Sequence, residues 1–168
     1  YYWVEANTIN INFKRGGKLK KTPLYEIYCK LGGKIIDFVD WQLPVKYAGI
    51  LEEHRQVRST ADLFDISHMG RIMVEGKDAE YFLNKLLTND ITAEEDNQAV
   101  YSPMCYSHGG VVDDLLVYRF NQEKYLIVAN ASNTEKDLAW FKANLKERLK
   151  LRIFKEALRQ IYLQGCYR

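Results

Sequence analysis

The sequence lacks the residues and runs that mark several large classes of protein. Its three cysteines are odd in number and far apart in the chain, which excludes a disulfide framework and a CxxC metal or redox pair. None of its three histidines stands at HxxxH or Cys-rich spacing, so we expect no metal site. Neither GxGxxG nor GxxxxGK[ST] occurs, so a nucleotide cofactor has no support.

Long apolar runs and a basic face are also missing. No run approaches the ~20 apolar residues that cross a bilayer, and the first twenty residues are polar, unlike a secretory signal. The net charge is +2. Residues 1–21 hold +4 of it, which leaves 2 − 4 = −2 for the rest. We therefore expect neither a membrane nor a nucleic-acid partner.

What is present is the composition of a globular domain. The chain has 168 residues, of which 47% are hydrophobic and 27% charged, enough to bury a core. A reducing compartment fits the cysteines best. Residues 1–20, which begin with Tyr1, are interpreted as a leader outside the fold.

Periodicity predicts helices and mostly antiparallel strands that alternate along the chain, which is the α+β class, with sheets flanked by helices. In the first half we expect an irregular loop over residues 39–44. The elements expected there are helices 22–31 and 50–58 and strands 34–38, 63–66 and 71–75.

The second half is expected to contain a meander between helices. Ser132 and Glu135 have the spacing of a capping box, and Leu138, Phe141, Leu145 and Leu149 would share one face of the helix that follows. The elements expected are helices 78–89, 132–150 and 154–160 and strands 99–104, 111–120, 124–128 and one starting at 162–163.

The acid pair Asp113-Asp114 is the sharpest local feature. In a strand, Asp114 would share a face with Val112 and Leu116, and Asp113 would share the other with Val111. At least one carboxylate would thus lie among apolar neighbours, where its charge requires a donor or a cation. Such a carboxylate could contact a cationic or NH-rich ligand. The pattern alone favours the alternative that both acids cap the turn after Gly109-Gly110.

Three further segments could line a site. The break Ser67-His68-Met69-Gly70 separates two strands, and His68 could be a base or a structural hydrogen bonder. Met69 could contact a ligand or pack. Tyr101 and Asn130 lie at strand ends, where binding residues collect. Alternatively, Tyr101 packs on the sheet and Asn130 caps the next helix.

Six collinear segments together resemble the T-protein of the glycine cleavage system, a folate-dependent aminomethyltransferase family. The resemblance runs from about Lys20 to Phe141 and weakens towards Gly165. The segments are Lys21–Tyr25, Leu63–Gly70, Leu87–Asp90, Tyr101–Cys105, Gly109–Tyr118 and Val128–Ala131.

The resemblance implies an enzyme that moves an aminomethyl carbon from the dihydrolipoyl arm of H-protein to tetrahydrofolate. The products would be 5,10-methylenetetrahydrofolate and ammonia. It implies a cytoplasmic location, or the mitochondrial matrix in a eukaryote. Asp114 would be the catalytic, folate-contacting carboxylate and Asp113 a supporting one. Met69, Tyr101 and Asn130 would line the folate pocket.

The family builds a three-domain cloverleaf of more than twice this length, so the resemblance also implies a truncated site. Residues 60–150 would form most of the middle domain, and 21–59 with 151–168 part of the first. The triplet Val39-Asp40-Trp41 departs from the family's pattern. Two alternatives are a non-enzymatic folate-binding homologue involved in iron–sulfur protein maturation and the folate domain of a sarcosine or dimethylglycine oxidising enzyme.

Overall fold

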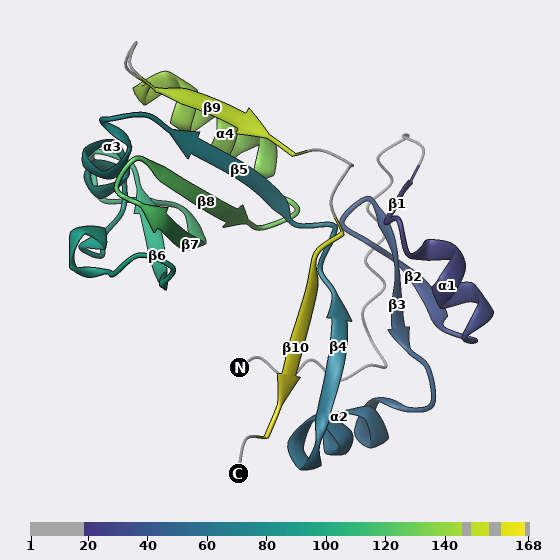
Figure 1. Cartoon of the computed structure of the whole chain (residues 1–168). Helices are drawn as coiled ribbons and strands as arrows, with labels where there is room; N and C mark the ends of the chain where they lie inside the picture. The colour runs from purple at the N-terminus through teal and green to yellow at the C-terminus, as the bar shows by residue number, and fades with distance from the viewer. Residues whose placement is uncertain (1–18, 146–148, 155–158, 167–168) are drawn as a thin grey trace.

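A computed structural model describes residues 19–145, 149–154 and 159–166. Over these residues the chain forms three sheets and four α-helices, with mostly antiparallel strand pairing, as the α+β prediction required (Figure 1). No helix in the described ranges is long and apolar enough to span a membrane.

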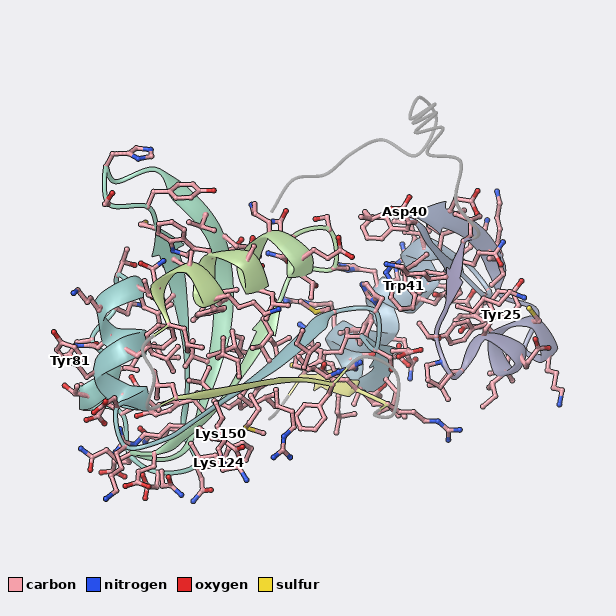
Figure 2. The ribbon with its side chains drawn as sticks, turned by 90° about the horizontal axis from the view of Figure 1, so that it is seen from above. Tyr25, Asp40, Trp41, Tyr81, Lys124 and Lys150 are labelled. Carbon is pink, nitrogen blue, oxygen red and sulfur yellow. The ribbon has the colours of Figure 1, made fainter. Side chains whose placement is uncertain are left out.

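The largest sheet has five strands in the order β6-β7-β8-β5-β9, and all of its pairs are antiparallel. Lys124 and Lys150 flank Glu75 from the two strands beside β5, so their side chains lie together at one end of the sheet (Figure 2). The strands are β5 (Gly70–Glu75), β6 (Ala99–Cys105), β7 (Val111–Asn121), β8 (Lys124–Ala129) and β9 (Lys150–Ile153).

Two helices cover one face of this sheet and close the core. They are α3 (Ala79–Leu86) and α4 (Thr134–Asn144). Alternate strand residues point towards the helices, as strand geometry requires. The fully buried members of this core include Ile72, Leu83, Leu115, Ile127 and Phe141. The sheet therefore has a helix-covered face and a second face.

The first part of the chain forms a smaller sheet beside helix α1 (Tyr25–Lys30). Its strands are β1 (Lys20–Lys21), β2 (Lys34–Phe38) and β3 (Trp41–Lys46), in the order β1-β3-β2. The prediction of an irregular loop over residues 39–44 was wrong. Val39 and Asp40 alone form the turn, both with positive φ (48° and 65°), and Trp41 already pairs with Phe38. Asp40 and Trp41 mark the tip of this hairpin in Figure 2.

A third sheet pairs two distant segments, β4 (Ala61–Asp65) and β10 (Ile161–Gly165), after helix α2 (Ile50–Ser59). The predicted helix 50–58 and the strands near 63 and 162 are thus confirmed. This sheet extends away from the five-stranded sheet (Figure 1). Leu63, Ile161 and Leu163 are each more than half exposed on it.

The end of α4 differs from the sequence prediction. The helix ends at Asn144, and after the undescribed residues 146–148 the chain continues as strand β9, so the predicted helix to residue 150 was wrong. Leu149 still joins the core, but from the segment that leads into β9. Most of the helix predicted over 154–160 lies outside the described residues, and the described Phe154, Arg159 and Gln160 are not helical.

Candidate functional site

The acid pair lies where β7 begins, beside the end of β8. A register shift between Met104 and Cys105 lets Cys105 pair with Val111 and Met104 with Asp113, so Val112 is the extra residue of a β-bulge. The bulge turns Val112 into the core and leaves Val111 exposed, which corrects the predicted placement of those two valines. From Asp113 onwards the alternation follows the prediction.

Asp113 points to the helix-covered face and is only 4% exposed. Its Oδ1 accepts hydrogen bonds from Asn130 Nδ2 at 3.0 Å and from Asn133 Nδ2 at 2.7 Å. Its Oδ2 accepts from the backbone N–H of Asn130 at 3.4 Å. Burial raises the pKa of Asp113, but hydrogen bonds from Asp137 and the two asparagines outweigh burial and hold that pKa below its usual value.

Asp114 points to the second face of the sheet and is partly exposed. Its Oδ1 accepts a hydrogen bond from Asn130 Nδ2 at 3.1 Å. Within the described part of the chain no donor meets its Oδ2. One oxygen of this carboxylate is thus held in place, and the other is open to a ligand.

Asn130 connects the two acids. Its Nδ2 donates to both side chains and, at 3.2 Å, to the backbone carbonyl of Asp114. The alternative in which the acids cap the turn after Gly109-Gly110 was therefore wrong. That turn is closed by its own backbone, with Tyr106 N–H donating to Gly110 O. The capping role for the Asn130 side chain was wrong as well, because the N-cap residue of α4 is Asn133 and no side chain makes a capping bond there.

The second face beside Asp114 combines aliphatic side chains with Tyr101 and the buried guanidinium of Arg71. Leu116 pairs with Tyr101 on one side and Val128 on the other, and Val128 pairs with Arg71, so these four residues form one row across the sheet. Residues paired in this way project to the same face. Tyr101 is 58% exposed at the edge of the row.

Met69 and Asn130 occupy neighbouring positions at the same end of the sheet. Gly70 pairs with Ala129, so the residues that precede and follow them, Met69 and Asn130, lie next to each other at the strand ends. Gly70 also lies against Thr134, where an added Cβ would come within 2.4 Å of the Thr134 Oγ1. The structure thus gathers Met69, Asn130 and Asp114 at one end of the sheet and puts Tyr101 on the same face.

His68 has a packing role in this structure. Its ring lies edge-on to Phe38 and Trp41, with centroid separations of 6.3 and 6.4 Å. Burial lowers the pKa of His68, against the attraction of Asp65. These contacts attach the β2–β3 hairpin to the break before β5.

Sequence reasoning missed two residues behind the acid pair, Asn133 and Asp137. Asn133 is the N-cap residue of α4, which corrects the predicted capping box at Ser132, and its side-chain amide binds Asp113 in place of capping. Asp137 is fully buried. The signal was available, since Asp137 stands four residues before Phe141 and so shares its core face.

The sequence profile described as GCVT N-terminal domain matches residues 24–167. The chain belongs to this family. The match extends past Phe141, where the sequence resemblance weakened, and reaches β10 and the residues beyond it.

Curated relatives carry the name Aminomethyltransferase. The one from Desulfitobacterium hafniense (strain DSM 10664 / DCB-2) is 60% identical over 126 residues, which are 75% of this chain and 34% of that protein. The one from Halalkalibacterium halodurans is 47% identical over 148 residues, 88% of this chain and 40% of that protein. The chain thus spans between a third and two fifths of their length.

A solved relative has the same fold. The crystal structure of glycine cleavage system aminomethyltransferase T from Bartonella henselae superposes with a TM-score of 0.81 at 36% identity, covering 88% of this chain and 41% of that one. These names do not favour the iron–sulfur maturation or sarcosine-oxidising alternatives.

Proposed function

We propose that the protein to which this chain belongs is the aminomethyltransferase of the glycine cleavage system, and that Asp114 is its catalytic carboxylate. The transfer would move an aminomethyl carbon from the lipoyl arm of H-protein to tetrahydrofolate. Family membership supports the reaction class. The partner and the folate are proposed from the solved relative's place in the glycine cleavage system and from the resemblance of the six segments.

The observation that carries the proposal is the asymmetric support of Asp114. Asn130 holds one of its oxygens and leaves the other open on the second face. A carboxylate that is already oriented stabilises positive charge without the cost of reorganising when that charge develops. The same oxygen can accept a hydrogen bond from an N–H group of a bound molecule.

The neighbours of Asp114 fit a flat heteroaromatic group bearing N–H donors, such as the pterin of a folate. Leu116 and the ring of Tyr101 supply apolar surface on the same face, and Met69 lies at the adjacent strand end. Ligand sites commonly combine such surface with a few fixed polar groups. We propose Met69, Tyr101, Asp114 and Asn130 as the folate-binding residues of this chain.

Tetrahydrofolate, when bound, supplies the nitrogen that accepts the carbon. Within this chain, Asp114 would orient that N–H and stabilise the positive charge that develops nearby. Asn130 would fix the angle of the Asp114 carboxylate. Asp113 would support Asn130 and Asp114 from the helix-covered face, where its Oδ1 accepts a hydrogen bond from the Asn130 amide.

Replacing Asp114 by Asn in the full-length protein tests the catalytic assignment. The amide keeps an oxygen that can accept from Asn130 but removes the negative charge, so the fold should persist while the transfer rate falls roughly 10²-fold or more. The measurement is the rate of methylenetetrahydrofolate formation, together with a thermal melt.

The matched control is Asp37→Asn, which removes the same charge from an exposed position on β2. Its rate should equal that of the wild type. Near-normal transfer by the Asp114→Asn enzyme would eliminate Asp114 as the catalytic carboxylate.

A further inference from the structure

An acidic side chain, Asp137, is fully buried behind the proposed site. It lies on α4, on the helix-covered face. Among the described residues neither of its oxygens meets a hydrogen-bond donor. A buried carboxylate with no donor is costly, and such a group normally keeps its proton.

Asp113 faces Asp137 and differs in what surrounds it. Two asparagine side chains and one backbone N–H donate to Asp113. The carboxyl groups of Asp113 and Asp137 are close enough to form a hydrogen bond with each other. Two carboxyl groups can share such a bond only when one of them carries a proton. All of the other donors converge on Asp113, so Asp113 is the charged partner and Asp137 the protonated one.

We propose that Asp137 retains its proton at neutral pH and uses it to donate a hydrogen bond to Asp113. Asp137 is thereby a positioning residue, which fixes Asn130 and, through Asn130, the Asp114 carboxylate. The relay consists of two hydrogen bonds that Asn130 Nδ2 donates, one to Asp113 Oδ1 and one to Asp114 Oδ1. Its consequence for catalysis rests on the function proposed above, whereas the protonation itself does not.

The charges around Asp137 agree with this assignment. Burial raises the pKa of Asp137 to about 8, with further contributions from the hydrogen bond with Asp113 and the negative charges of Asp113 and Asp114 on β7. Lys136 on α4 acts in the opposite direction, but its Nζ donates to the carbonyl of Val112.

The protonation of Asp137 makes the stability of the fold depend on pH. Because the pKa of Asp137 is raised from 3.8 to about 8, the folded state holds this proton more tightly than the unfolded state between those values. Asp137 therefore lowers stability progressively as pH rises through that window, and its effect levels off above pH 8. Loss of the proton also gives the buried pair a second negative charge, which would draw the Asn130 and Asn133 amides out of their present arrangement.

In Asp137→Asn the side-chain amide can donate a hydrogen bond to Asp113 at every pH and never becomes charged. The variant therefore keeps the donor and removes the titration. We expect the melting temperature of this variant, relative to wild type, to increase steadily from pH 5 to pH 8. Glu135→Gln, an exposed acid on the same helix, is the matched control and should show a constant difference. A constant difference for Asp137→Asn as well would overturn the proposal.

The affinity of the full-length protein for tetrahydrofolate tests the positioning role of Asp137. Wild-type affinity should weaken above about pH 8, and that of Asp137→Asn should not. At pH 7, Asp137→Ala should bind roughly tenfold more weakly than Asp137→Asn, because Asp113 then loses a buried donor. Equal pH profiles for the wild type and Asp137→Asn would overturn the role.

The two proposals can fail separately. If the wild type binds no tetrahydrofolate at any pH, the proposed function fails, and the melting profiles still decide the protonation of Asp137. Asp114→Asn should lose binding but keep the wild-type dependence of melting temperature on pH. If Asp137→Ala does not fold, the comparison of wild type with Asp137→Asn decides alone.

Discussion

Asp113 and Asp114 are adjacent in sequence but have different surroundings. The strand sends Asp113 into the space under α4, where amides satisfy its charge, and Asp114 to the second face, where one oxygen remains open. The difference between a supporting acid and a ligand-binding acid is thus one step of the strand alternation. The neighbouring bulge at Val112 leaves this alternation intact from Asp113 onwards.

Asn130 should be intolerant of a third negative charge. Asn130→Asp keeps the size of the side chain but replaces its donor by a carboxylate that faces Asp113 and Asp114. Mutual repulsion raises the pKa values of these acids in the folded state. Stability should therefore fall as pH rises above about 4, and the loss of melting temperature relative to wild type should be larger at pH 8 than at pH 5.

The control for this change is Asn121→Asp. Asn121 is exposed, and its Oδ1 accepts from the Glu123 N–H, a bond that Asp can also make. Its melting temperature should stay close to that of the wild type at both pH values. An Asn130→Asp protein that melts like the control would show that the amide does not bridge the acids.

At the scale of elements, the β2–β3 hairpin shows what residue patterns conceal. A two-residue hairpin turn with positive φ at both positions favours Asn-Gly. Here the turn is Val39-Asp40, which carries no such signal. Pro44 within β3 is also a residue type that disfavours strand pairing. The pairing with β2 nevertheless runs from Trp41 to Pro44 and resumes at Lys46 after a register shift at Val45. Packing of the hairpin tip on His68 accompanies this unfavourable turn.

Val39→Asn should stabilise the protein. A β-branched residue with φ of 48° is strained, whereas Asn tolerates that conformation. We expect a gain of about 1 kcal/mol and a higher melting temperature. Val45→Asn on β3 is the control, because Val45 has the same chemistry and nearly the same exposure (42% against 43%) but a negative φ. The control should be neutral or destabilising, and an equal gain in both would refute the turn argument.

At the scale of the whole molecule, hydrogen bonds continue the pairing of the β4–β10 sheet and that of the five-stranded sheet into the break between them, which we call the junction. Ser67 Oγ accepts from the Gln160 N–H at 2.9 Å, and the Ile66 N–H donates to the Gln160 carbonyl. The Phe154 N–H donates to the Arg71 carbonyl on the other side of the break. These bonds connect segments more than eighty residues apart.

Ser67→Ala should loosen this junction. Ser67 is buried, and its loss leaves the Gln160 N–H without its partner, at a cost of about 1–3 kcal/mol. The free energy of unfolding from denaturant titration measures this cost. Ser107→Ala, in the exposed turn after β6, is the control and should change it by less than about 0.5 kcal/mol. A Ser67→Ala protein as stable as the control would mean that the junction does not depend on this hydroxyl.

The sequence by itself determined most of the elements and the α+β class, because apolar periodicity reports which face of each helix or strand is buried. Resemblance to a family also singled out Asp114 over Asp113, and alternation along β7 then separated the faces of the two acids. The division into a middle and a first domain stays a prediction, as do the folate-contacting roles.

Only the tertiary structure decided what surrounds the acids. Pairing with β5 made residues 150–153 a strand, β9, although the apolar spacing had predicted a helix that reached residue 150. Tertiary packing also brought Asn130, Asn133 and Asp137 next to Asp113, which lies some twenty residues away in sequence. Local patterns favoured turn capping because they report only neighbours in sequence. Which donor meets a buried carboxylate depends on contacts between distant segments, and these contacts exist only once the sheet and α4 have packed.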